Sequence, residues 1–120
     1  MKKRILVVDD DEYIRDLYNE ILSDAGYDVE IASDGADALD VLEKKSFDLV
    51  LLDIMMPKMD GIEMLKHLSG KKKEISVVLL TNLAHNPVLK EAKSLGAIDY
   101  LIKADLTPDQ LVEKIKGYFG

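Results

Sequence analysis

The stretch Leu51–Gly61, LLDIMMPKMDG, places a single carboxylate at the end of an aliphatic run. Together with the two residues before it, the run forms an unbroken apolar segment, which is typical of a strand buried on both faces of a sheet. Asp53 closes this segment, and a Met-Pro-Lys loop follows at once. Burying an unpaired charge is costly, so an acid at this place needs a reason. The stretch therefore predicts a core strand and raises the question of what its carboxylate does.

Five short segments of the chain have the composition of strands, and the segment before Asp53 is one of them. In chain order they are Ile5–Val8, Val29–Ala32, Leu49–Leu52, Val77–Leu80 and Tyr100–Ile102. Apolar residues between and after them recur at the spacing of a helix face, within residues 14–22, 38–42, 62–68, 88–95 and 111–119. The chain therefore alternates between predicted strands and predicted helices.

Helix start and stop signals fall where this alternation requires them. Asn86-Pro87 and Thr107-Pro108 each have an N-cap residue followed by proline at the first helical position. The second of these segments and Asp60–Glu63 also have the spacing of a capping box. Gly26 and Gly96 stand where the first and fourth predicted helices end.

The alternation of strand and helix predicts the fold class. Five βα units with short connections imply a parallel sheet, right-handed crossovers and helices on both faces. We expect a flavodoxin-like (βα)5 three-layer α/β sandwich, with a central five-stranded sheet in the order 2-1-3-4-5. Residues 1–120 are expected to form one domain, because no repeat or low-complexity segment divides them.

Composition and charge exclude several classes of protein. Of the 120 residues, 48% are hydrophobic and 32% are charged, as in ordinary globular domains, and there is no cysteine to form a disulfide or to bind zinc. No apolar run approaches the roughly 20 residues of a membrane span, and the run after the basic start is too short for a signal peptide. The net charge of −7 and the pI of about 4.8 argue against direct nucleic-acid binding. We expect a cytoplasmic protein that binds no membrane.

Polar side chains close four of the five predicted strands. They are Asp9 and Asp10 after the first strand, Asp53 at the third, Thr81 at the fourth and Lys103 at the fifth. Ligands bind at the carboxyl edge of an open α/β sheet, next to the point where the strand order reverses. Because the first and third strands are neighbours in the expected order, the three carboxylates should converge there.

Three carboxylates in one place repel each other unless a cation is present. Hard oxygen ligands in an open pocket suit Mg²⁺, which keeps several waters and accepts a phosphate oxygen as a further ligand. Lys103 adds a second positive charge and Thr81 a hydroxyl donor. The sequence therefore predicts a site for phosphoryl transfer in which a carboxylate accepts the group.

At this point the chain strongly resembles the receiver domain of two-component response regulators over essentially its whole length. The resemblance is carried by VVDDDE after the first strand, LLDIMMPKMDG, LLTN after the fourth strand and DYLIK at the fifth, in that order. It implies that Asp53 is the phosphoacceptor, that Asp9, Asp10 and the backbone carbonyl of Met55 bind Mg²⁺, and that Thr81 and Lys103 contact the phosphoryl group. Tyr100 matches the switch aromatic of the family, which turns inward when the threonine moves toward the phosphate.

The resemblance also implies partners and a mode of action. The phosphoryl donor would be a sensor histidine kinase or a histidine phosphotransfer protein. A downstream protein would bind the face formed by the fourth helix, the fifth strand and the fifth helix, in response to a shift between two conformations. The only catalysis expected is the domain's own phosphoryl transfer and dephosphorylation. Because no linker follows the last helix, we expect a stand-alone regulator of the chemotaxis or phosphorelay type, although a receiver cut from a longer chain is an open alternative.

The sequence departs from the family pattern in three places. Ala104 replaces the usual proline after the lysine, and a cis bond before a non-proline residue costs about 2.5–4 kcal/mol, so we predict a trans Lys103–Ala104 bond. Asn82 is larger than the small residue usual after the threonine. Met55 and Leu83 resemble the positions that tune phosphate lifetime, and their apolar side chains predict slow self-dephosphorylation.

The same residues are open to other interpretations. Asp10 or Asp11 could simply cap the first helix, and Tyr100 could serve packing alone. A phosphatase with an aspartyl-phosphate would need a second acid two residues after Asp53, where Met55 stands. A flavin-binding module would need a hydroxyl- and glycine-rich loop after the first strand, where acids stand instead. A phosphate-independent interaction module is the remaining alternative, because of Asn82 and Ala104.

Overall fold

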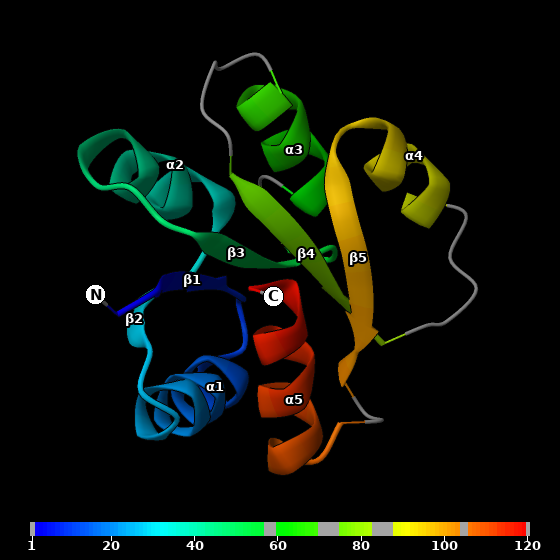
Figure 1. Cartoon of the computed structure of the whole chain (residues 1–120). Coiled ribbons are helices and arrows are strands. Elements are labelled where there is room, and N and C mark those ends of the chain that lie inside the picture. Colours follow the sequence, from blue (N-terminus) through cyan, green and yellow to red (C-terminus); the bar gives the residue numbers. More distant parts are fainter. Residues whose placement is uncertain (1, 57–59, 70–74, 83–87, 104–105, 120) are drawn as a thin grey trace.

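The computed structural model describes residues 2–56, 60–69, 75–82, 88–103 and 106–119 of the chain. Strands and helices alternate along it (Figure 1). The strands are β1 (Arg4–Val8), β2 (Asp28–Ala32), β3 (Leu49–Asp53), β4 (Ser76–Thr81) and β5 (Ala97–Ile102). The helices are α1 (Glu12–Asp24), α2 (Gly35–Lys44), α3 (Gly61–Ser69), α4 (Val88–Ser94) and α5 (Pro108–Tyr118).

All five strands form one parallel sheet in the order β2-β1-β3-β4-β5, as predicted. The register pairs Val8 with Leu52 and Asp53 with Leu80, so that β1, β3 and β4 end close together. Thr81 pairs with Ile102 at the end of β5. This register brings the carboxyl ends of four strands to one edge of the sheet, which is the edge where the sequence predicts the site.

Two hydrophobic clusters fill the space between the sheet and its helices. One lies on the face covered by α2, α3 and α4, and the other lies on the face covered by α1 and α5 (Figure 1). Residues of β1 and β3 alternate between the two clusters, because successive side chains of a strand point to opposite faces. The unbroken apolar runs are therefore explained by burial on both faces, and the three-layer flavodoxin-like fold is confirmed.

Local signals in the sequence act as expected where the structure describes them. Thr107 and Gln110 form both hydrogen bonds of a capping box at the start of α5, and the Glu63 amide donates to the side chain of Asp60 at the start of α3 (2.9 Å). Gly26 and Gly96 have φ values of 98° and 107°, which a residue with a Cβ rarely adopts. The Asn86-Pro87 start predicted for the fourth helix lies outside the described residues.

The fifth strand differs from its prediction at its start. The structure begins β5 at Ala97, three residues before the predicted Tyr100. The pairing with β4 is irregular there, because Val77 pairs with Ala97 and Val78 with Asp99, which leaves the intervening Ile98 49% exposed at the edge of the sheet. An edge strand with a bulge lacks a continuous apolar pattern, and the sequence therefore underestimated its length.

None of the described helices is both long enough and apolar enough to cross a membrane.

Candidate functional site

Asp53 is the last residue of β3 and is only 5% exposed. One carboxylate oxygen, Oδ1, accepts a hydrogen bond from the backbone amide of Met55 (3.2 Å). The other, Oδ2, lies 3.3 Å from Nζ of Lys103. The backbone beyond Asp53 is also fixed, because the amide of Ile54 donates to the carbonyl of Leu80 (3.1 Å). Asp53 is thus a buried carboxylate with a defined orientation and a cation beside it.

Asp9 follows β1 directly and is fully buried. Its Oδ2 accepts a hydrogen bond from Nζ of Lys103 (2.5 Å), and its Oδ1 accepts one from the amide of Asp11 (2.9 Å). Asp11 is the N-cap of α1, where its own side chain accepts from the amide of Tyr13. One of the two alternatives for capping this helix is thereby confirmed, and Asp10 is left exposed at the mouth of the site.

The predicted convergence of the three carboxylates is observed. Each of Asp9, Asp10 and Asp53 offers an oxygen atom, and these atoms lie within 4.8 Å of one another. The donor set consists of hard, anionic oxygens from two neighbouring strand ends, with one member exposed and two buried. This is the chemistry that Mg²⁺ prefers in proteins. The residues present therefore fit a divalent cation.

The charges of the site shift the pKa values of Asp53 and Lys103. Burial, together with repulsion from Asp9, raises the pKa of Asp53 from 3.8 to about 7, although Lys103 and the Met55 amide act in the opposite direction. Burial by itself would lower the pKa of Lys103, but its hydrogen bond to Asp9 and its attraction to both carboxylates more than offset burial and raise it. Lys103 therefore stays positively charged between two acidic side chains. Its charge does not fully offset the effects of burial and of Asp9 on Asp53.

The remaining predicted residues surround this centre. Thr81 is the last residue of β4 and is buried, and Lys103 comes directly after β5, whose last residue pairs with Thr81. Met55, two residues after Asp53, is 72% exposed. Tyr100 is half-buried and packs against the cluster covered by α2, α3 and α4.

Two of the departures from the family pattern lie outside the described residues. These are the Lys103–Ala104 peptide bond and Leu83, and both remain predictions. Asn82 is described and exposed, next to the buried Thr81.

Two residues that sequence reasoning did not single out also shape the site. Gly61 begins α3, and a Cβ at this position would lie 2.7 Å from the carbonyl oxygen of Asp53 and 2.9 Å from Cα of Ile54. Arg15 donates from Nη1 to the carbonyl of Asp9 (2.8 Å) from the second turn of α1. The glycine at the end of LLDIMMPKMDG and the arginine four residues after Asp11 can both be read in the sequence. Their roles in the site, however, follow only from the residues that lie close to them in the structure.

Comparison with known proteins agrees with this geometry. The chain belongs to the response regulator receiver domain family, which it matches over residues 5–116. It is 38% identical to sporulation initiation phosphotransferase F of Bacillus subtilis over 98% of its length and 94% of that protein. Several longer curated response regulators are 40–42% identical, and the chain spans 45–48% of their length.

Solved structures with this fold give the same assignment. The chemotaxis response regulator CheY4 of Vibrio cholerae superimposes with a TM-score of 0.91 at 33% identity, covering 98% of each chain. The response regulator TrrA of Thermotoga maritima, determined in complex with Mg²⁺ and beryllofluoride, superimposes with a TM-score of 0.84 at 38% identity, covering 96% of this chain and 97% of that one. The chain is thus a signalling receiver domain rather than a metabolic enzyme, with an acidic cluster that could hold a metal ion.

Proposed function

We propose that this receiver domain is a phosphorylation-dependent switch in which Asp53 accepts a phosphoryl group from a sensor histidine kinase or a histidine phosphotransfer protein. One observation carries the proposal: the side chain of Asp53 is buried at a strand end, oriented by the Met55 amide, and lies 3.3 Å from the Lys103 ammonium. A carboxylate held in a fixed orientation with a cation at its side is suited to attack a phosphoryl group.

The residues of this chain would divide the reaction between them. An oxygen of Asp53 forms a bond to phosphorus while the bond between phosphorus and the donor's histidine nitrogen breaks. Lys103 stabilises the charge on the phosphoryl oxygens, and Thr81 donates its hydroxyl to one of them. Asp9 holds Lys103 in position by the hydrogen bond between its Oδ2 and Nζ (2.5 Å). The transfer therefore depends on positioning and charge, as is usual for phosphoryl groups.

Mg²⁺ is the proposed cofactor, held by Asp9, Asp10, Asp53 and the carbonyl of Met55. When bound, it would neutralise the crowded carboxylates and the charge of the phosphoryl oxygens. The support comes from the donor set of the three aspartates and from TrrA, a relative of this fold whose complex contains Mg²⁺ and beryllofluoride.

The proposed output is a change in protein binding at the face formed by α4, β5 and α5. Tyr100 lies on β5 and Thr81 lies on the neighbouring strand, so movement of the threonine could reach this face through β5. Support for a role in a relay comes from the similarity to sporulation initiation phosphotransferase F. A cytoplasmic location and a single receiver domain over residues 1–120 are part of the same proposal.

Incubation with acetyl phosphate and Mg²⁺, followed by intact-mass measurement, tests the function. We expect one adduct of a single phosphoryl group on the wild-type chain and none on Asp53→Asn. Asp40→Asn, which changes an exposed aspartate of α2, is the matched control and should still be modified. An unmodified wild-type chain would instead favour the phosphate-independent interaction module.

A further inference from the structure

A hydrogen bond joins the last turn of α5 to β5. The hydroxyl of Tyr118 donates to Oδ2 of Asp99 at 2.6 Å. The bond joins a side chain at the end of α5 to a side chain of the edge strand of the sheet. Burial, the hydrogen bond to Asp99 and the charge of Asp99 all raise the pKa of Tyr118, so the phenol stays protonated as a donor. The contact is therefore a specific polar tie between these two elements.

The same aspartate also holds the backbone of the residue after it. Oδ1 of Asp99 accepts a hydrogen bond from the amide of Tyr100 (2.8 Å). Tyr118 packs with the cluster between α1, α5 and the sheet, whereas Tyr100 packs with the cluster on the opposite face. Asp99 thus connects the end of α5 with the backbone of Tyr100 across the edge strand, next to the irregular pairing of β5 with β4.

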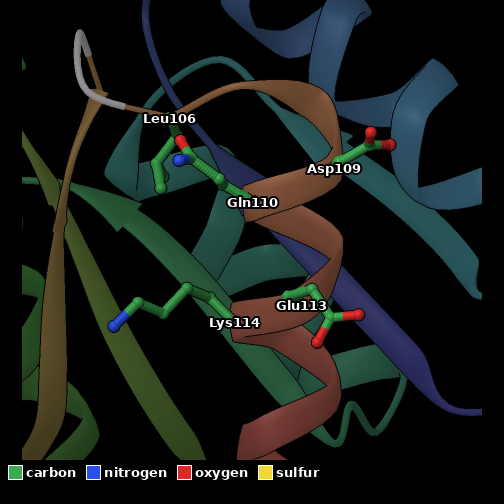
Figure 2. Close-up of a pocket in the computed structure, with 5 residues that line it drawn as sticks. All are labelled: Leu106, Asp109, Gln110, Glu113 and Lys114. Atoms are coloured by element: carbon green, nitrogen blue, oxygen red, sulfur yellow. The ribbon is translucent and has the colours of Figure 1, made fainter.

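The first half of α5 has open space beside it. A shallow groove of about 400 Å³ is lined by Leu106, Asp109, Gln110, Glu113 and Lys114. Figure 2 shows Gln110 and Lys114 on the side of the helix that faces β5, with Asp109 and Glu113 on the opposite side. Gln110, Lys114 and Tyr118 follow each other at four-residue steps, so they share one helix face. Tyr118 ties this face to β5 at the end of the helix, and Gln110 and Lys114 on the same face contribute to the groove.

We propose that the Tyr118–Asp99 hydrogen bond is a latch that stabilises one arrangement of β5 and α5 and thereby opposes the uptake of a phosphoryl group at Asp53. The inference rests on the proposed function, because it assumes that phosphorylation moves β5 at Tyr100. Any displacement of the backbone at Asp99–Tyr100 must carry Tyr118 with it or break this hydrogen bond. The latch sets the free-energy difference between the two conformations, and hence the apparent affinity for a phosphoryl group.

The position of Lys103 gives the direction of the effect. Its Nζ is hydrogen-bonded to Asp9 at 2.5 Å and is farther from Asp53, at 3.3 Å. A phosphoryl group on Asp53 would draw this ammonium toward its own oxygens. In the conformation with the latch formed, Lys103 is therefore bound to Asp9. Breaking the latch should favour the conformation in which Lys103 binds a phosphoryl group on Asp53.

Titration with beryllofluoride at saturating Mg²⁺, followed by calorimetry, tests the latch. Beryllofluoride binds a carboxylate oxygen as its fourth ligand, and the resulting tetrahedral group resembles a phosphoryl group on aspartate. Tyr118→Phe removes the hydroxyl alone, and we expect it to bind beryllofluoride about three- to tenfold more tightly than wild type, the range that one hydrogen bond supplies. In an Asp99→Ala background, Tyr118→Phe should change the affinity by less than twofold, because its partner is already absent.

Tyr27→Phe is the matched control for a general loosening of this end of the molecule. Tyr27 packs against Phe119, directly after Tyr118, with ring centroids 5.5 Å apart, and it has no hydrogen bond to β5 among the described residues. We expect this variant to keep the wild-type affinity. Equal or weaker binding by Tyr118→Phe, or equal tightening by Tyr27→Phe, overturns the latch while leaving the function of Asp53 intact. A wild-type chain that takes up neither beryllofluoride nor a phosphoryl adduct overturns the proposed function, and the latch with it.

Discussion

Asp53 and Met55 are two residues apart at the end of β3, yet their side chains have opposite environments. Asp53 is 5% exposed and held by two contacts, while Met55 is 72% exposed. An exposed thioether beside the proposed phosphoryl site cannot orient an attacking water as an amide can.

This difference makes Met55 the residue through which phosphate lifetime can be tested. We expect Met55→Asn to shorten the lifetime of the phosphorylated chain several-fold, because the amide can hydrogen-bond a water near the phosphorus atom. The decay of the phosphoryl adduct in intact-mass spectra measures it. Met55→Leu keeps an apolar side chain and should leave the lifetime unchanged; if Asn and Leu behave alike, the slow-hydrolysis hypothesis is wrong.

The junction between β3 and α3 is the element that places Asp53, the proposed nucleophile. Gly61 begins α3 so close to the end of β3 that a methyl group would lie under 3 Å from two backbone atoms of residues 53 and 54. Its amide also donates to the carbonyl of Ile54 (3.0 Å), which closes the intervening loop. The position of Asp53 thus depends on close contact between a strand end and a helix start.

Gly61→Ala tests this dependence. Because backbone atoms must shift to admit the methyl group, we expect a loss of about 1–3 kcal/mol in the free energy of unfolding and slower phosphorylation by acetyl phosphate. Gly117→Ala is the control, since a Cβ there meets nothing within 4 Å and an alanine in α5 should gain about 0.5–1 kcal/mol. Urea unfolding of both variants provides the measurement, and a neutral effect of Gly61→Ala would contradict the close packing.

For the molecule as a whole, the carboxylates at the acidic edge of the sheet lower the free energy of unfolding. Asp9 and Asp53 are buried within reach of one another, and Lys103 supplies one positive charge for both. The raised pKa of Asp53 means that the native state binds a proton more tightly than the unfolded chain does. The stability of the domain should therefore be linked to pH and to Mg²⁺.

The sign of the pH dependence follows from the direction of that shift. Between pH 4 and pH 7 the native state binds more protons at Asp53, so this residue lowers the free energy of unfolding as pH rises toward about 7. In the absence of Mg²⁺, Asp53→Asn should stabilise the domain by roughly 1–3 kcal/mol at pH 8 and much less at pH 4. Urea unfolding at both pH values measures this difference. An equal effect at both would show that the ionisation of Asp53 does not lower the stability of the domain.

If the three aspartates bind Mg²⁺, the ion should offset the loss of stability that the ionised Asp53 causes. Added Mg²⁺ is expected to stabilise the wild-type chain at pH 8 and to have a smaller effect on Asp53→Asn, because binding to the native state alone shifts the folding equilibrium. Thermal unfolding at increasing Mg²⁺ concentration measures both. No stabilisation of the wild-type chain at millimolar Mg²⁺ would exclude a metal site at these residues.

The sequence was sufficient to predict the order of the strands and helices, the five-stranded parallel sheet and the residues that meet at its carboxyl edge. It could do so because buried strands such as Leu49–Leu52 need apolar side chains on both faces, and because parallel strands place their ends together. The start of β5 was missed, since an exposed edge strand with a bulge has no continuous pattern.

How these residues act on each other follows from their positions in the folded chain. Distances showed that Lys103 is shared between Asp9 and Asp53, that Gly61 lies against the backbone of Asp53, and that Tyr118 ties α5 to Asp99. Such contacts join residues far apart in the chain or depend on the path of the backbone between them. Hydrogen bonds and charge pairs depend on separations of a few ångströms, which the local patterns of a sequence do not encode.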